Sequence, residues 1–392
     1  MNETDVSGPT TVPVVLGVGP TALGVMRCLG RNGLRPFLVV RSGDLAKLSR
    51  WTGGRCLLLD GPGSAEDVLD LPRRLGVDRV VVVPCTDEWT KIVSGLLPHE
   101  TILGSVAPRE VVDLLIDKLA FAETLSRFDV PGPRTTPVRC ESDLEEVELE
   151  GTFLKPRQSQ LFAQHYHRKA FTFENMTEAE QALRLMTDVG LEGVLQEYVP
   201  GPPTAHYFID GFARSDGSIA SLFARRRIRM FPLDFGNSTL LVSVPLDEVR
   251  QAADALVRLL VGIGYHGVFS AEFKLDPRDG LFKILEVNSR PWWFVEYASL
   301  CGVDVCGMAY RDALGLPVDE VLSYKVGVRG IFLPQDVLAF RELRRSGSLS
   351  TLDWLRSIAG AKATVFEWSD PLPGIALPLI YFRSRRRRLR AA

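Results

Sequence analysis

Short apolar runs alternate with a helical pattern in the first part of the chain. Residues 12–19 form an apolar run that ends in glycines, residues 22–29 have helical spacing, and residues 36–40 form a second apolar run. A strand, a glycine turn, a helix and a second strand make a βαβ unit. Residues 78–84 add another apolar run, and the polar residues 85–88 follow it. The pattern predicts a parallel α/β sheet with ligand-binding loops at the carboxyl ends of its strands.

After residue 112 the pattern changes to helices mixed with short strands. Apolar and polar positions alternate across residues 205–244, which favours antiparallel strands. We therefore expect a domain junction near residue 112. The other expected elements are helices at residues 113–125, 178–189, 246–263 and 304–316 and short strands at residues 153–156 and 193–201.

The polar positions of residues 283–291 are grouped on one face. Successive side chains of a strand point to opposite faces, so Glu286, Asn288 and Arg290 project together while the residues between them point into a core. Residues 276–280 connect this run to an earlier one as a hairpin, which places Glu272 on the neighbouring strand. The predicted hairpin therefore carries two carboxylates, an amide and a guanidinium in one place.

Two facing carboxylates are costly unless a cation neutralises them. The oxygen atoms of Glu272, Glu286 and Asn288 suit Mg²⁺, which takes few protein ligands and completes its octahedron with water and phosphate oxygens. This interpretation indicates a nucleotide. The alternative is a solvated hairpin with alternating charges.

Arginines recur at every second position of the expected strand around residues 224–230. Arg225, Arg227 and Arg229 would share one face. Such a face suits bidentate recognition of phosphate and carboxylate groups. The alternative is a charged edge strand that discourages aggregation.

Composition limits the class of protein. The 392 residues suffice for two or three domains, and 46% hydrophobic residues is ordinary for a soluble globular chain. A net charge of −2 gives no support for a nucleic acid partner. The six cysteines form no Cys-x-x-Cys pair, and residues 1–5 lack the order of a secretory signal. We expect a cytoplasmic protein without a zinc knuckle or disulfide framework, and nothing in the sequence defines an oligomeric state.

The C-terminal tail qualifies this picture. Residues 374–382 are apolar, and six arginines follow within residues 383–390. An apolar segment beside a polybasic cluster can dock on an anionic membrane surface. The alternative is a core element followed by a solvated tail. We therefore expect either peripheral membrane contact or this soluble arrangement.

A dinucleotide site in the first βαβ unit is disfavoured. Gly17, Gly19 and Gly24 have the spacing G-x-G-x-x-x-x-G, and Arg41 stands where an acidic residue would close the second strand. An NAD-dependent oxidoreductase therefore fails on the glycine spacing.

A series of motifs across residues 10–325 resembles the ATP-grasp superfamily, in particular its carboxylate–amine ligases and predicted ATP-dependent carboligases. The motifs are Asp117-Lys118, residues 153–156, residues 195–201, Glu272 and residues 286–291. Each is weak alone, but their order and spacing are typical of that superfamily.

The resemblance implies an ATP-grasp fold of mixed α/β and α+β domains. We predict an N-terminal α/β domain at residues 1–112 and an ATP-grasp domain at residues 113–325, followed by a C-terminal appendix at residues 326–392. Within the ATP-grasp domain, the resemblance predicts a lid at about residues 135–195 and a core at about residues 196–325, two α+β subdomains that enclose the nucleotide.

The same resemblance implies roles for residues at the nucleotide. It gives Lys118 and Lys155 to the ATP phosphates and places Gln196 at the adenine edge, with the Glu197 carbonyl beside it and the Val199 N–H as donor. Pro200 has no N–H, which excludes Glu197 as the start of this adenine-binding pair. The Glu197 side chain would instead hold a lysine or line the cleft.

The implied reaction joins a carboxylate to an amine. Glu272, Glu286 and Asn288 would hold Mg²⁺, or Mn²⁺ in its place, while the substrate carboxylate attacks the γ-phosphoryl group. An amine then displaces phosphate from the acyl phosphate. Arg290 would steady the acyl phosphate or the oxyanion, and related enzymes place basic residues such as Arg227 and Arg229 nearby. Members of the superfamily join amino acids, peptides and other carboxylates to amines, and one branch adds D-aspartate to cell-wall precursors.

One departure from the family pattern concerns the phosphate lid. Residues 158–169 contain no glycine, although lids of this kind usually wrap phosphates with glycine-rich backbone. Arg168 and Lys169 would supply charge instead, and His165 and His167 have the spacing of a metal pair without a third ligand. An ATP-binding regulatory or scaffold protein without ligase turnover is therefore the alternative function.

Overall fold

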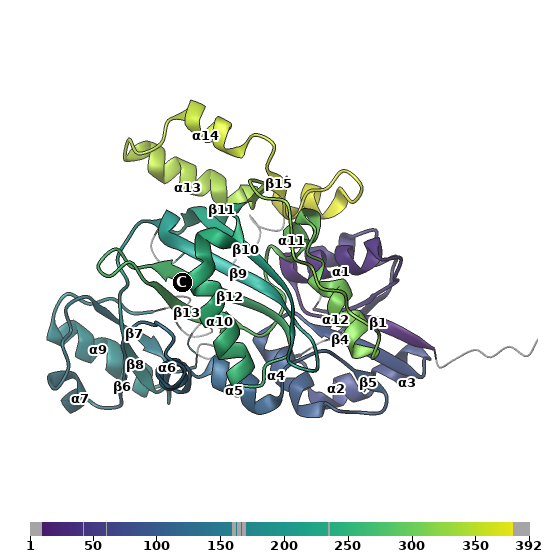
Figure 1. Ribbon diagram of the computed structural model, residues 1–392, viewed down its shortest axis with the longest axis horizontal. Helices are drawn as coiled ribbons and strands as arrows, with labels where there is room; N and C mark the ends of the chain where they lie inside the picture. The colour runs from purple at the N-terminus through teal and green to yellow at the C-terminus, as the bar shows by residue number, and fades with distance from the viewer. Residues whose placement is uncertain are drawn as a thin grey trace, which may run out of the picture.

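The computed structural model describes residues 10–378, apart from residues 42, 60, 159–161, 163–165, 167–169, 234 and 235. The described strands form sheets of five, seven and three strands. Figure 1 shows the seven-stranded sheet in the middle of the molecule, between the N-terminal sheet on one side and the small sheet on the other. The predicted combination of a parallel α/β sheet with α+β parts is confirmed.

The N-terminal sheet is parallel, as the apolar runs predict. Its elements are β1 (Thr11–Leu16), α1 (Gly19–Arg31), β2 (Phe37–Val40), η1 (Leu45–Leu48), β3 (Cys56–Leu58), α2 (Ala65–Leu69), α3 (Leu71–Leu75), β4 (Arg79–Pro84), α4 (Asp87–Leu96) and β5 (Ile102–Leu103). The strand order is β3-β2-β1-β4-β5, and Val15 is aligned with Leu38 on one side and with Val83 on the other. Helices cover both faces of such a sheet, which explains why β1 reads as a continuous apolar run.

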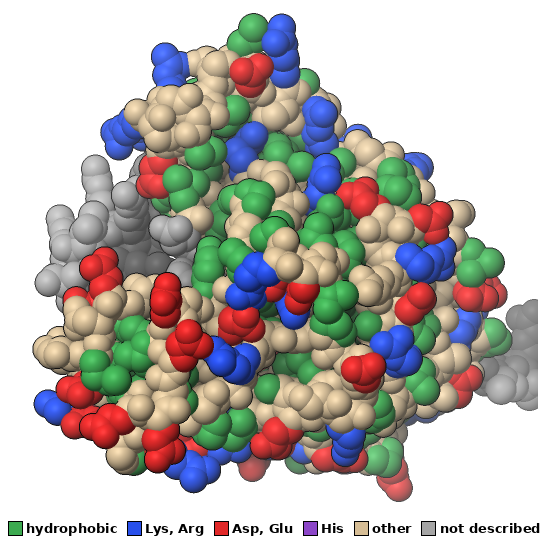
Figure 2. All heavy atoms as spheres, turned by 60° about the vertical axis from the view of Figure 1, so that its left-hand side comes forward, with side chains coloured by type: hydrophobic (Ala, Val, Ile, Leu, Met, Phe, Trp, Pro, Cys, Tyr) green, Lys and Arg blue, Asp and Glu red, His purple; other side chains and the backbone are tan. Residues whose placement is uncertain are grey.

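A small subdomain surrounds the three-stranded antiparallel sheet. Its elements and the helices that lead to it are α5 (Arg109–Ile116), α6 (Lys118–Arg127), β6 (Thr135–Val138), α7 (Glu141–Glu145), β7 (Thr152–Pro156), α9 (Met176–Thr187) and β8 (Gly193–Glu197). The strand order is β6-β8-β7, and Leu154, Leu195 and Met186 belong to its core. Figure 2 shows acidic side chains gathered on one part of the surface, and residues 141–150 of this subdomain include six acidic residues.

The central sheet carries the predicted hairpin. Its elements and the helices around it are η2 (Pro203–Ala205), β9 (His206–Ala213), β10 (Ile219–Phe231), β11 (Asn237–Ser243), η3 (Leu246–Val249), α10 (Arg250–Gly262), β12 (Gly267–Leu275), β13 (Phe282–Asn288), α11 (Val295–Cys301) and α12 (Val305–Ala313). One core cluster joins Leu256 of α10 to Phe269 and Ile209 of the sheet. Another joins Phe212 and Phe223 of the sheet to the N-terminal domain. The hairpin is therefore fixed between two cores.

The C-terminal segment completes the central sheet. It contains β14 (Arg329–Ile331), α13 (Leu333–Arg345), α14 (Thr351–Ile358) and β15 (Lys362–Ala363), and the full strand order is β13-β12-β9-β10-β11-β14-β15. Asp336 is fully buried and accepts two hydrogen bonds of 3.0 Å from Arg229 and one of 2.8 Å from Trp354 Nε1. This segment is therefore part of the packed fold.

A buried arginine joins the first helix to the last described residues. Arg27 is fully buried, and its Nε donates to Asp370 Oδ2 at 2.9 Å. Its Nη1 donates to Glu296 Oε2 at 3.0 Å, and its Nη2 donates to the Val365 carbonyl at 2.8 Å. The guanidinium of α1 is thus bound by α11 and by the C-terminal segment together.

Some expected elements differ in detail. The single helix expected at residues 113–125 is two helices, because Asp117 ends α5 and then caps α6 by accepting from the N–H groups of Leu119 and Ala120. Position 112 lies within α5, and the domain boundaries stay predictions. The expectations for His165, His167, Arg168 and Lys169 and for the arginine tail fall on residues outside the described ones. Among the described helices, none combines the length and apolar character needed to cross a bilayer.

Candidate active site

The hairpin brings the two predicted metal-binding carboxylates together. Glu272 and Glu286 are directly opposed across β12 and β13, and Ser270 is opposed to Asn288. The Asn288 amide donates a hydrogen bond of 3.1 Å to Glu286 Oε1. Directly opposed residues of an antiparallel pair project from the same face. The hairpin that the sequence predicts is confirmed, and its oxygen donors face one space.

Glu272 is bound by two basic groups from the neighbouring strands. Arg227 Nη2 donates to Glu272 Oε1 at 2.9 Å, and His206 Nδ1 lies 2.8 Å from the same oxygen. Burial lowers the pKa of His206 and that of Arg227. A neutral imidazole with its Nδ1–H donating fits this contact. Arg227 thus offsets the negative charge of Glu272, whereas the Glu286 carboxylate has no arginine or lysine among the described ion pairs.

Arg290 is oriented from two sides. Its Nε and Nη2 donate to the two carboxylate oxygens of Asp87 at 2.6 and 3.3 Å, and its Nη2 also donates to Asn288 Oδ1 at 3.2 Å. Asp87 is the first residue of α4 and follows the carboxyl end of β4. The sequence predicts a ligand-binding loop at residues 85–88. It does not predict this contact, because 203 residues separate the partners.

The charge of Lys118, the first predicted phosphate-binding lysine, is coupled to that of the second, Lys155. Burial and the positive charge of Lys155 together lower the pKa of Lys118 to about 8. The negative charges of Glu286 and Asp87 act in the opposite direction on the same pKa. Coulomb interactions weaken with distance, so Lys118 lies within electrostatic range of Lys155, Glu286 and Asp87. A phosphate group bound there would relieve the repulsion between the lysines.

The predicted adenine-binding run follows the small sheet. Gln196 is 6% exposed, accepts from Lys155 Nζ at 2.9 Å and donates to Thr135 Oγ1 at 3.1 Å. The Val199 N–H donates no hydrogen bond to another described residue. The Glu197 carboxylate accepts from Arg278 Nη2 at 2.5 Å and from the Arg134 N–H at 3.0 Å, so its described partner is an arginine and not a lysine, and its place at the cleft stays a prediction.

The three arginines of β10 bind three different carboxylates, although Arg225 and Arg227 both lie over the Phe208 ring. Arg225 binds the buried Asp210, Arg227 binds Glu272 and Arg229 binds Asp336. Register shifts flank Arg229 in the pairing of β10 with β11, and irregularities of this kind re-aim side chains. The structure thus brings Arg227 to the paired carboxylates and uses Arg229 to hold α13.

The donor set at the hairpin suits Mg²⁺. Glu272 and Glu286 offer carboxylate oxygens, and the Asn288 amide presents its oxygen or its nitrogen by rotation. Mg²⁺ prefers oxygen ligands, keeps several waters and binds beside phosphates. Two carboxylates opposed across one hairpin repel each other unless a cation lies close to both, which is the electrostatic reason for a divalent cation. The residues therefore fit Mg²⁺.

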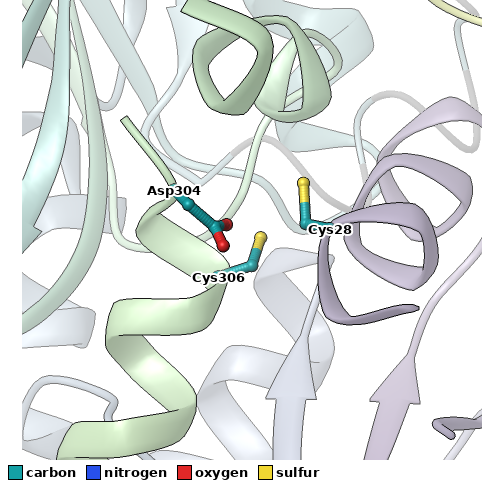
Figure 3. A group of neighbouring side chains, drawn as sticks. All are labelled: Cys28, Asp304 and Cys306. Carbon is teal, nitrogen blue, oxygen red and sulfur yellow. The ribbon is translucent and has the colours of Figure 1, made fainter. Parts of the chain in front are cut away.

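A separate group of metal-ligating side chains lies between α1 and α12. Figure 3 shows Cys28, Cys306 and Asp304, whose ligand atoms lie within 4.8 Å of one another. The thiols are buried, and a hydrogen bond with Cys28 together with burial raises the pKa of Cys306. The oxygens of Asp304 already accept from the Gly307 N–H and from Asn32 Nδ2. These contacts account for the group as packing and helix capping.

Comparison with known proteins relates the chain to ligases. No family model matches it. It is 24% identical to a D-aspartate ligase from Enterococcus faecium over 250 residues, which cover 60% of this chain and 58% of the relative. The match thus spans less than two thirds of the relative's length.

Solved structures show the same fold. An N5-carboxyaminoimidazole synthetase from Staphylococcus aureus superposes with a TM-score of 0.65 at 14% identity, covering 88% of both chains. The biotin carboxylase domain of a 2-oxoglutarate carboxylase from Hydrogenobacter thermophilus, solved with MgADP and bicarbonate, gives 0.61 at 16% identity over 81% of this chain and 73% of that one. The relative and both structures belong to the ATP-grasp superfamily, and this chain has the ATP-grasp fold.

Proposed function

We propose that this protein is an ATP-dependent carboxylate–amine ligase that forms an amide or peptide-like bond through an acyl phosphate and releases ADP and phosphate. One observation supports the proposal above the others: within an ATP-grasp fold, Glu272 and Glu286 oppose each other on a hairpin whose Asn288 binds Arg290, and Lys118 is electrostatically coupled to Lys155 and to Glu286. The D-aspartate ligase relative supports the same class of reaction.

Each group of residues has a task in this proposal. Lys118 and Lys155 bind the ATP phosphates as compact cations, and Gln196 with the Val199 N–H reads the adenine edge. Glu272, Glu286 and Asn288 hold Mg²⁺, with Mn²⁺ as a substitute. When bound, the metal neutralises phosphate charge and leaves the γ-phosphoryl group open to attack.

Two arginines have different tasks near the reacting carboxylate. Arg290 projects beside Asn288 and Glu286, where it neutralises the acyl phosphate and then the oxyanion that forms when the amine attacks. Arg227 holds Glu272 in place and adds positive charge beside it. No side-chain nucleophile is required, because the phosphate is the leaving group.

The proposed function includes a location and a class of substrate. We place the protein in the cytoplasm and its substrates among small carboxylates and amines, with no nucleic acid partner. The name of the relative makes D-aspartate the first carboxylate to test.

An ADP-release screen tests the proposal. The protein is incubated with MgATP and pairs of amino acids and small carboxylates, including D-aspartate, and condensed products are detected by mass. Glu286→Ala should abolish ADP formation in a folded protein, whereas Asp279→Ala, which removes a carboxylate bound to Lys283 in the same hairpin, should not. Turnover at the wild-type rate by Glu286→Ala would sink the metal assignment. Stabilisation by MgATP without turnover on any pair would favour the ATP-binding scaffold.

A further inference from the structure

Large apolar side chains are exposed to solvent near the C-terminal end of the described residues. Trp368 is 88% exposed, Leu372 is 58% exposed and Ile375 is 61% exposed. These three residues are named the C-terminal ridge. Phe366 supports it from below, because its ring meets the Trp368 ring edge to face with centroids 5.0 Å apart. Single exposed apolar residues are ordinary on protein surfaces, whereas a group of them on one short segment indicates an interaction site.

The ridge is built on a firmly held backbone. Asp370, which is 1% exposed, accepts hydrogen bonds from Arg27, from Ser49 Oγ and from the Arg50 N–H, all at 2.9 Å or less. Leu377 is 8% exposed and belongs to the main core cluster. The chain is therefore anchored at Asp370, between Trp368 and Leu372, and again at Leu377 after Ile375, while the three ridge side chains are exposed. Their exposure is a property of the fold.

The positive charge at this end of the chain is in the sequence that follows the ridge, because the acidic residues of the ridge segment, Glu367 and Asp370, are paired with Arg31 and Arg27. Arg50 donates from its guanidinium to the Ser369 carbonyl, within the ridge segment. Residues 379–392, which follow it directly, contain six arginines and no acidic residue. The acidic residues 141–150 are remote, since Figure 1 shows α7 and the yellow segment after β15 on opposite sides of the molecule. An anionic surface would thus attract this end of the molecule and repel the other.

We propose that the C-terminal ridge inserts into the surface of an anionic lipid bilayer while the arginine tail binds its headgroups. Trp, Leu and Ile side chains next to clustered arginines match the interface, where apolar groups enter the acyl boundary and cations meet phosphate. A second copy of the chain fits less well, because ridge-to-ridge pairing would bring two tails of six positive charges together. A nucleic acid would use the tail but leave the ridge unused.

Vesicle sedimentation tests this proposal without reference to ligase activity. The full chain is mixed with vesicles of phosphatidylcholine alone or of equal parts phosphatidylcholine and phosphatidylglycerol. We expect binding to the anionic vesicles, and a partition coefficient lowered at least about tenfold in the triple variant Trp368→Ala, Leu372→Ser, Ile375→Ser. Deletion of residues 379–392 should abolish binding, and raised salt should weaken it.

A matched control uses apolar residues elsewhere. Leu352 and Leu355 of α14 are 56% and 50% exposed, and changing both to serine should leave vesicle binding unaltered. Unchanged thermal unfolding shows that all variants are folded. The proposal is overturned if the triple variant binds anionic vesicles like the wild type, if duplex DNA competes fully with the vesicles, or if the ridge instead mediates a dimer that the triple variant dissociates.

Discussion

Replacing Lys118 by methionine tests whether this lysine is held ready for an anionic ligand. Methionine keeps an unbranched side chain and removes the charge. The pKa of Lys118 is lowered by burial from its usual 10.5 to about 8. That gap corresponds to about 3 kcal/mol of unfavourable free energy in the protonated folded protein. We therefore expect Lys118→Met to raise the free energy of unfolding by about 1–3 kcal/mol at pH 7 and to weaken MgATP binding at least about tenfold.

The pH dependence of this effect has a definite sign. Below pH 8 Lys118 is protonated in the folded and in the unfolded chain, so the whole penalty is present. Between pH 8 and pH 10.5 the folded protein releases the proton while the unfolded chain keeps it, and the penalty disappears. The stability advantage of Lys118→Met should thus be constant below pH 8 and vanish as the pH approaches 10.5.

Urea unfolding at a series of pH values measures this advantage, and isothermal titration measures MgATP binding. Lys325→Met is the control, because Lys325 is an exposed lysine and its replacement should change neither quantity. A destabilised Lys118→Met protein, or an advantage that does not change between pH 7 and pH 10, would refute the reasoning. Unaltered MgATP affinity would remove Lys118 from the phosphate site.

Further predictions concern the partners of the site and of the fold. Asp87→Asn should lower the rate of ADP release about tenfold while leaving stabilisation by MgADP in a thermal-shift assay intact, and Asp87→Glu should restore part of the rate, because Asp87 orients Arg290. Asp336→Ala should cost about 3–5 kcal/mol in denaturant unfolding, since it strands the buried Arg229, whereas Asp353→Ala at an exposed position should cost little. His206→Gln should lose less stability than the wild type as the pH falls below 6.5. Burial lowers the pKa of His206 in the folded protein, so the unfolded chain takes up a proton at this residue first and is favoured by acid. Equal losses of unfolding free energy in both proteins would exclude His206 as a cause of the acid sensitivity.

The parts of the fold that rest on local periodicity were predictable. The apolar runs of β1 and β4 and the hairpin of β12 and β13 follow from patterns a few residues long. The pairing of Glu272 with Glu286 was within reach for the same reason, since a short connection and a period of two fix which residues oppose one another. The break at Asp117 was missed, because a capping aspartate inside an apolar period reads as one more polar position.

Contacts between distant segments were beyond sequence reasoning. Asp87, His206 and Asp336 each bind a predicted site residue, yet the contact depends on how the sheets pack together. A single carboxylate or imidazole belongs to no sequence pattern from which its partner could be predicted. Arg229 shows the converse, because register shifts on both sides of it change an environment that strict alternation would have predicted.

The buried guanidinium of Arg27 makes the two ends of the described chain depend on each other. A protein shortened before Val365 would retain Glu296 as a partner of Arg27 but lose the Asp370 carboxylate and the Val365 carbonyl. The buried guanidinium would then lack two of these three hydrogen-bond acceptors. The first βαβ unit is therefore completed only by residues that lie 343 positions further along the chain. Full stability of the N-terminal part should accordingly be reached only after residues 365–370 have been synthesised and have packed against α1.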